Sequence, residues 1–295
     1  MRCGLTENAP LARYTSWRIG GVANELFIPS SIDDFSHFLK KKPTAEPLYI
    51  LGLGSNTLIR DGGIPGTVVV LSSSGLQSLS VLVDCVIRAE AGVSCAKMAR
   101  FAARNQLSGM TFLAGVPGTI GGALAMNAGA HGDETWNHVV SVETIDRQGK
   151  RHVRSPSEFT VAYRSVKSPF DECFVAANFV HEEATKEQAL AAIKKVLDHR
   201  VATQPGNMPN GGSVFRNPVG DFAGRLIEVC GLKGYRFGHS WISELHANFI
   251  VHDGKGSAKE VEHLIHLIEE TILSKMGITL EREVKVIGCG SNDNS

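Results

Sequence analysis

Two clusters of glycine constrain the fold of this chain more than any other feature of its sequence. The chain has 31 glycines, and several gather in Gly52-Leu-Gly-Ser-Asn56 and in the apolar run Gly115-Val-Pro-Gly-Thr-Ile-Gly-Gly-Ala-Leu-Ala-Met-Asn-Ala-Gly-Ala130. Without a Cβ, glycine lets a backbone approach another group closely or adopt a positive φ. Each glycine inside a helix costs about 1 kcal/mol relative to alanine. Such clusters therefore indicate close packing of the backbone against the protein or against a ligand.

The first cluster follows an apolar run and predicts a strand that ends in a glycine turn. Its amides, with the side chains of Ser55 and Asn56, can converge on a phosphate. A tight turn between two strands explains the same residues, and a Gly-x-Gly pair leaves both interpretations open. The segment lacks the third glycine and the helix start of a Rossmann fingerprint. Neither cluster ends in the Gly-Lys-Ser/Thr of a nucleotide-hydrolysing loop.

The second cluster is almost uncharged and holds Gly118, Gly121 and Gly122 within a few residues. One interpretation is a helix of small residues that packs closely on a sheet. The other, which we favour, is a backbone pressed against a large planar ligand, with amides offered to a pyrophosphate. We favour it because three glycines so close together are unfavourable in an ordinary core helix.

The composition disfavours several classes of protein. Its 30 basic residues balance 30 acidic ones, so the sequence implies no large field for nucleic acid or a membrane surface. The six cysteines form no Cys-x-x-Cys pair, which disfavours a zinc ribbon or a redox dithiol. No apolar run approaches the roughly 18 residues of a membrane span, and the first residues lack the apolar core of a signal peptide. We expect reduced cysteines, a cytoplasmic protein and no membrane partner.

Helix and strand patterns are mixed without strict alternation, which predicts an α+β fold. Caps and apolar stripes predict helices over residues 31–42, 94–107, 185–202 and 257–276, the last with a Ser257–Glu260 capping box and Gly277 as its stop. β-like runs cover residues 48–51, 67–71, 86–91, 139–145, 174–180 and 248–251, and Gln148-Gly149 predicts a turn. The length of 295 residues implies two or three domains, and the change of pattern near residue 183 predicts a boundary.

Three further segments complete a recognisable order. They are Ala162-Tyr-Arg164, Gly211-Gly-Ser-Val-Phe-Arg-Asn-Pro218 and Leu280-Glu-Arg-Glu-Val-Lys-Val-Ile-Gly288. With the glycine clusters, YTSWRIGG, AGRLIEVCGLKG and HANFIVH, they resemble the MurB reductases, the UDP-N-acetylenolpyruvoylglucosamine reductase family, over about residues 10–288. Leu53 departs from the glycine that the family usually has there. The short interval between Arg164 and Ser213 is similar to the family's shorter-loop branch, which leaves open which residues close over the substrate.

This resemblance implies a two-part FAD-binding fold of the vanillyl-alcohol-oxidase (PCMH) type. Residues 1–182 would be the FAD-binding region, in subdomains of about 1–73 and 74–182. Residues 183–279 would bind the substrate, and 280–295 would be a strand returning to the active site and a polar tail. FAD would be held non-covalently, with NADPH as co-substrate. The residues implied to bind FAD are Gly52, Gly54, Ser55, Asn56, Thr57, Leu58, Gly115, Pro117, Gly118, Thr119, Gly121, Gly122, Ala125 and Asn127.

The resemblance also implies a reaction, the reduction of UDP-N-acetylglucosamine enolpyruvate to UDP-N-acetylmuramate in peptidoglycan precursor synthesis, by a monomer. Arg164 is expected to stabilise charge that develops on the substrate carboxylate. Ser213 is expected to protonate the enolate carbon. Glu283 is expected to donate a hydrogen bond as a protonated acid or to orient Arg164. The residues expected to contact the substrate are Tyr163, Arg200, Asn217, His246 and Asn248, with Lys233 or Arg225 as further cations.

Other functions stay open from the residues alone. A sugar or alcohol oxidase of the same flavin fold would share both glycine clusters, and so would a non-catalytic flavin or nucleotide-sugar-binding module. A serine hydrolase that uses Ser213 is disfavoured, because the chain has no Gly-x-Ser-x-Gly elbow. His131, Asp133, Glu134 and His138 have metal-ligating side chains, but we expect a loop there and no metal site.

Overall fold

The computed structural model describes residues 3–72 and 75–290, and the chain divides into two compact units. Unit 1 comprises Met1–Thr6, Leu26–Leu53 and Thr67–Arg200, and unit 2 comprises Glu7–Glu25, Gly54–Gly66 and Val201–Ser295. The units alternate along the chain, which passes from one to the other within β1 (Gly4–Pro10), β2 (Val22–Ile28), β5 (Ile64–Val70) and α4 (Lys186–Thr203). The functional domains expected from the sequence are contiguous, and their boundaries stay a prediction.

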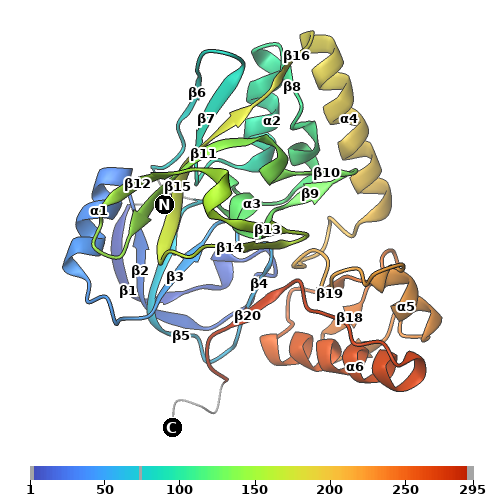
Figure 1. Cartoon of the computed structure of the whole chain (residues 1–295). Helices are drawn as coiled ribbons and strands as arrows, with labels where there is room; N and C mark the ends of the chain where they lie inside the picture. Colours follow the sequence, from blue (N-terminus) through green and yellow to red (C-terminus); the bar gives the residue numbers. More distant parts are fainter. Residues whose placement is uncertain (1–2, 73–74, 291–295) are drawn as a thin grey trace. The chain divides into compact units, whose positions relative to one another are not determined.

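The centre of unit 1 is a five-stranded antiparallel sheet with the order β12-β11-β15-β7-β6 (Figure 1). Its strands are β6 (Leu79–Val81), β7 (Val86–Glu90), β11 (Val139–Asp146), β12 (Arg151–Arg154) and β15 (Glu172–Val180). A hairpin joins β11 to β12 at Gly149, whose φ of 73° favours glycine. A second, parallel pairing in unit 1 runs from Leu48↔Thr67 to Leu51↔Val70, between β3 (Leu48–Leu51) and β5.

Helices of unit 1 begin at polar caps, and the sequence predicts those at residues 31 and 94. Ser31 caps α1 (Ile32–Lys41), Ser94 caps α2 (Cys95–Arg104) and Thr119 caps α3 (Ile120–Met126), each by accepting a backbone N–H bond in the first turn. Their apolar faces bury residues in two cores, one of which includes Met98, Leu113 and Phe179, and the other Phe35, Leu39 and Val175. The shorter elements are β8 (Leu107–Ser108), η2 (Thr111–Gly115), β9 (Gly129–Ala130), β10 (Asp133–Glu134), η3 (Thr135–His138), η4 (Pro156–Glu158), β13 (Thr160–Ala162), β14 (Ser165–Lys167) and β16 (Glu182–Glu183).

A hydrophobic core of unit 2 lies among α5, α6 and a small sheet. Its sheet has the order β17-β18-β19, and a separate parallel pair joins β4 to β20. The core includes Trp17, Phe215, Ile227, Ile242 and Ile265. The elements are η1 (Ala12–Tyr14), β4 (Thr57–Ile59), α5 (Ala223–Val229), β17 (Arg236–Phe237), β18 (Ser240–Ile242), β19 (Ile250–His252), α6 (Ala258–Met276) and β20 (Lys285–Ile287).

The longest helix of unit 2, α6, shows how sequence signals fix both ends of an element. The predicted capping box forms, because Ser257 accepts from the N–H of Glu260 while the Glu260 carboxylate accepts from the N–H of Ser257. Asp61 adds a second cap by accepting from the N–H groups of Ala258 and Lys259, both at 3.0 Å. Gly277 ends the helix with a φ of 69°.

Most predicted elements are confirmed, and the α+β class with them. All four predicted helices form, with ends shifted by a few residues at most, and so do the strands and the turn at Gly149. Two strands begin later than expected. The strand predicted over residues 248–251 begins at Ile250, and the strand expected within residues 280–295 is β20, which begins at Lys285. The end of the polar tail, residues 291–295, lies outside the described residues.

The chemistry of the cysteines follows the expectation, since all six are free thiols. Within the described parts of the chain, no helix is both long enough and apolar enough to cross a membrane.

Candidate functional site

Both glycines of the first cluster are required by the packing of the protein itself. In unit 1, a Cβ on Gly52 would lie 2.4 Å from the Thr119 hydroxyl oxygen. In unit 2, Gly54 has a φ of 60°, and a Cβ there would lie 2.4 Å from the carbonyl oxygen of Tyr14. The close approach expected from the sequence is therefore real, and the groups approached are parts of the protein.

The same cluster still offers donors to a ligand. Among the residues that the structure describes, the backbone N–H groups of Gly54, Ser55 and Asn56 have no hydrogen-bond acceptor. Successive N–H groups of this kind form an anion-binding concavity. Of the predicted neighbours, Thr57 is half-buried in β4, and Leu58 is a core residue of unit 2.

The second cluster forms the short helix α3, and most of its first-turn amides are already used. The N–H of Ile120 donates to the carbonyl of Val93, and that of Gly121 donates to Ala91. The N–H of Gly122 donates to the Thr119 hydroxyl at 3.3 Å. The helix also packs closely on the protein, as in the alternative interpretation of a helix of small residues, since a Cβ on Gly121 would lie 3.0 Å from the Cβ of Ala91.

Residues just before α3 retain donors in unit 1. In the described structure, the N–H groups of Gly118 and Thr119 have no acceptor, although the carbonyl of Gly118 accepts from Cys95 at 3.0 Å. Pro117 and Ala125 are exposed, and a Cβ on Gly115 would strike Val196 at 2.7 Å. The amides of this cluster that remain open are thus those of residues 118–119, just before the helix, and their contact with a cofactor stays a prediction.

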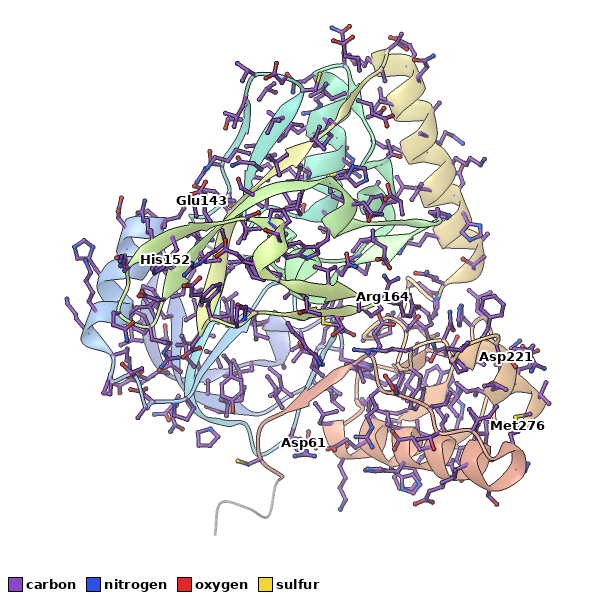
Figure 2. All side chains as sticks on the ribbon, in the orientation of Figure 1. Asp61, Glu143, His152, Arg164, Asp221 and Met276 are labelled. Atoms are coloured by element: carbon purple, nitrogen blue, oxygen red, sulfur yellow. The ribbon has the colours of Figure 1, made fainter. Side chains whose placement is uncertain are left out.

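Arg164 lies at the tip of the hairpin formed by β13 and β14, as Figure 2 shows, and it has a φ of 52°. Its guanidinium donates to the carbonyl oxygens of Asn127 at 3.3 Å and Gly129 at 2.6 Å. Tyr163 is half-exposed, and its ring centroid lies 4.9 Å from the Arg164 guanidinium. These bonds fix the direction of the guanidinium within unit 1.

Asn127 ends α3 in the left-handed conformation and holds the same hairpin. Its side-chain amide donates to Glu134 Oε2 at 2.7 Å and to the carbonyl of Ala162 at 3.3 Å, and its Oδ1 accepts from the N–H of Trp136. Asn127 is 1% exposed. The structure thus gives its side chain a set of partners inside unit 1, and contact with a cofactor stays a prediction.

Ser213 and Glu283 come together in unit 2 although they are far apart in sequence. The N–H of Glu283 donates at 2.8 Å to the carbonyl of Val214, the residue after Ser213. Asn56 donates through its side chain to the carbonyl of Glu283 at 3.0 Å. Within unit 2, Asn56, the Ser213 turn and the Glu283 segment are therefore joined by direct hydrogen bonds.

The turn before Ser213 depends on a residue that sequence reasoning missed. Asn210 accepts from the N–H of Gly212 at 3.0 Å through its side chain, and its amide group donates to the carbonyls of Pro205 and Met208. Gly212 has a φ of 75°, and a Cβ on Gly211 would overlap the ring of Trp17. The signal in the sequence is an asparagine two residues before a glycine, which is typical of an Asx-turn.

The residues expected to contact substrate have different environments. Arg200 is half-buried, and its pKa is lowered by desolvation. Asn217 accepts from the N–H of Ala223 at the start of α5. Burial also lowers the pKa of His246, whose Nδ1 accepts from the N–H of Asn248. Asn248 itself is buried.

The two further cations considered for the diphosphate are already paired. Arg225 forms an ion pair with Asp221, labelled in Figure 2, and Lys233 pairs with Glu228 at 2.9 Å. Of the side chains considered as metal ligands, Asp133 lies 2.7 Å from His138, and Glu134 accepts a hydrogen bond from Asn127. Within the described residues, no group of three or more His, Cys, Asp or Glu side chains has the geometry to hold a metal ion.

Several known proteins and two family models are similar to this chain. Residues 24–154 match the family described as "FAD binding domain", and residues 204–287 match "UDP-N-acetylenolpyruvoylglucosamine reductase, C-terminal domain". The UDP-N-acetylenolpyruvoylglucosamine reductase of Legionella pneumophila (strain Corby) is 55% identical over 282 residues, which cover 95% of this chain and 91% of that relative. The reductase of Thiobacillus denitrificans is 44% identical over 295 residues, with the same coverages of 95% and 91%.

A solved structure is similar along the whole length. The crystal structure of UDP-N-acetylenolpyruvylglucosamine reductase from Thermus caldophilus has a TM-score of 0.83 and 32% sequence identity, and the match covers 98% of this chain and 100% of that one. Identity at these levels over nearly the entire chain shows that the chain belongs to the family of UDP-N-acetylenolpyruvoylglucosamine reductases, which are FAD-dependent oxidoreductases.

Proposed function

We propose that this chain reduces the enolpyruvyl group of UDP-N-acetylglucosamine enolpyruvate, with NADPH as reductant and non-covalent FAD as cofactor. The product is UDP-N-acetylmuramate, a precursor of peptidoglycan, so the enzyme would act in the cytoplasm as a monomer and support cell shape and division. The observation that carries the proposal is the 55% identity to a reductase of this reaction over 95% of the chain.

Each unit offers donors that suit a phosphate group of FAD. Unit 1 has the open amides of Gly118 and Thr119, and unit 2 has those of Gly54, Ser55 and Asn56. An unpartnered buried N–H is unfavourable, and a bound phosphate oxygen would remove that penalty. The two-electron chemistry is that of FAD, which when bound can pass a hydride from NADPH to the substrate.

The reaction requires a hydride and a proton to arrive on neighbouring carbons. The π bond of the enolpyruvyl group breaks, and a C–H bond forms at the β-carbon with the hydride. Negative charge then spreads over the α-carbon and the carboxylate as an enolate. A proton added to the α-carbon completes the reduction, so that NADPH and one proton are consumed for each product formed.

Arg164 is proposed to stabilise the enolate. Its planar guanidinium suits a carboxylate, and charge grows on that carboxylate as the transition state is reached. Two backbone carbonyls hold the guanidinium, so little reorganisation would be needed. Glu283 is proposed to act as a protonated acid that donates a hydrogen bond to the substrate or as a group that orients Arg164.

Ser213 is proposed to protonate the α-carbon. In the described residues its hydroxyl has no hydrogen-bond partner, which leaves the proton available to a substrate. A serine hydroxyl is a weak acid, so it must meet a strongly basic carbon at short range. The proton it loses would be regained from water.

Arg200 is the best supported candidate for the substrate diphosphate. Its guanidinium is partly desolvated, and no carboxylate of the described residues forms an ion pair with it. A partly buried cation of this kind is stabilised by an anionic ligand. The remaining contacts, Tyr163, Asn217 and His246, stay predictions.

The proposal is tested with the purified protein and its visible spectrum. We expect a yellow protein whose flavin is released on denaturation, is bleached by NADPH, and is reoxidised rapidly by the enolpyruvyl substrate without oxygen. Reoxidation by oxygen with peroxide formation, and none by the enolpyruvyl substrate, would instead indicate an oxidase. Flavin that no substrate reoxidises would indicate a binding module, and a protein that takes up no FAD would contradict the proposal.

A further inference from the structure

Asn248, a buried side chain far from Ser213 in sequence, holds the backbone that directly follows Ser213. Its Oδ1 accepts from the N–H of Phe215 at 3.0 Å, and its Nδ2 donates to the carbonyl of the same residue at 2.8 Å. Its backbone carbonyl accepts from the N–H of Val214 at 2.9 Å. Asn248 is 3% exposed, so both side-chain groups are used inside the protein.

These bonds form one side of a three-layer arrangement of backbone in unit 2. On the other side, the carbonyl of Val214 accepts from the N–H groups of Glu283 and Val284, at 2.8 and 3.2 Å. Phe215 forms a β-bridge with Arg282. Residues 214–215 are therefore held between Asn248 and the segment that carries Glu283. A shift of Asn248 would move Ser213 and Glu283 together.

We infer that Asn248 is a positioning residue that sets the distance between the Ser213 hydroxyl and the substrate carbon it protonates. The inference rests on the proposed function, and it assigns Asn248 a role beyond the expected contact with the substrate. An asparagine is required because only an amide presents a donor and an acceptor side by side to the C=O and N–H of one residue. Alanine removes both, and aspartate keeps only the acceptor for the N–H of Phe215.

The physical consequence is selective. Loss of the amide leaves a buried N–H and a buried C=O of Phe215 without partners, and the turn moves until water or another group satisfies them. Displacement of a reacting group by about 1 Å can lower a rate about 100-fold. Reduction of the flavin by NADPH does not need the Ser213 proton, so only the second half of the reaction is expected to change.

The experiment compares N248A and N248D with wild type by rapid mixing. Flavin content and the rate of reduction by NADPH are expected to stay within about twofold. Reoxidation by UDP-N-acetylglucosamine enolpyruvate is expected to fall about 10- to 100-fold in N248A and less in N248D, which retains one of the two bonds. The solvent deuterium isotope effect on reoxidation should rise, because proton delivery becomes slower relative to hydride transfer. If Asn248 contributed to stability alone, the solvent deuterium isotope effect on reoxidation would not change.

The matched control is N178A in unit 1. Asn178 is half-buried and donates to the Ser141 hydroxyl at 2.9 Å. Its replacement by alanine therefore removes an amide hydrogen bond away from the Ser213 turn. Both half-reactions should be retained in this variant. Equal losses in both half-reactions of N248A, unchanged reoxidation, or failure of both Asn248 variants to fold and hold FAD would overturn the role of Asn248. A wild-type protein that the substrate never reoxidises would overturn the proposed function itself.

Discussion

Two buried asparagines, one in each unit, hold functional residues by different means. Asn127 ends α3 and reaches partners through a left-handed backbone conformation, with a φ of 43°. Its side chain bonds to Glu134, Ala162 and Trp136, and its carbonyl accepts from Arg164. Asn248 instead pairs with both backbone groups of a single residue, Phe215, that lies 33 positions away in sequence.

The difference shows which kind of function each arrangement can support. Asn127 distributes its bonds over several elements of unit 1, so its loss should loosen a region and lower stability. Asn248 concentrates its bonds on one turn, so its loss should displace one reacting group. Substitutions in both units can test this contrast.

Replacing Ser213 by alanine sets the largest loss that any change at Asn248 can cause. Without the hydroxyl, protonation of the α-carbon must use water, and reoxidation by the substrate should fall about 10²- to 10⁴-fold. Reduction by NADPH should stay normal in rapid-mixing absorbance. The exposed Ser157 gives a matched control, and S157A should match wild type. Unchanged reoxidation in S213A would remove Ser213 from the mechanism.

Replacing Asn127 by alanine should lower the free energy of unfolding by about 3 kcal/mol. The change orphans the buried N–H of Trp136 and removes a bond to the Glu134 carboxylate. Alanine is also less favourable than asparagine at this positive φ, which adds about 1 kcal/mol to the loss of stability. Urea unfolding of N127A and N127G separates the two effects, since glycine removes only the side chain. Equal stability of N127A and wild type would contradict the contrast between the two asparagines.

Acid should destabilise unit 1 through His181, a 5% exposed histidine whose Nδ1 lies 3.1 Å from the carbonyl of Phe179. Burial lowers its pKa from 6.5 to about 4. Between these two pH values the unfolded chain binds a proton that the native state does not, so stability falls as the pH falls through this window. Between pH 7 and pH 5 the loss should be about 2 kcal/mol. In urea unfolding, the stability that H181L loses between pH 7 and pH 5 should be smaller than that of wild type by this amount. Equal losses in the two proteins would show that His181 is not the group responsible.

Replacing Gly52 by alanine should have the smallest effect, about 1 kcal/mol. The added Cβ would overlap the Thr119 hydroxyl, which can turn away only by giving up its cap on Gly122. Because the two residues share one contact, G52A and T119A should not be additive. A double variant no less stable than T119A alone confirms the overlap, whereas full additivity in thermal unfolding would exclude it.

Local signals predicted the elements well because each depends on neighbours in sequence. Ser31, Ser94 and Ser257 cap the helices they precede, and Gly277 ends α6. The strand expected at residues 248–251 starts late, because Asn248 pairs with Phe215 instead of continuing the ladder of β19. The strand expected within residues 280–295 starts only at Lys285, and the backbone just before it pairs through a bridge between Arg282 and Phe215.

The glycine clusters and the order of the motifs can be read from the sequence alone. They indicate the family and the requirement for FAD, and they identify Arg164, Ser213 and Glu283 as candidate catalytic residues. The tertiary structure decided what each glycine packs against, which amides remain open, and that Asn127 and Asn248 bond within the protein. The physical reason is the separation of hydrogen-bond partners along the chain. Caps and turns satisfy backbone groups within a few residues, whereas the partners of Asn248 and Asn56 are dozens to hundreds of residues away and meet only when the chain folds.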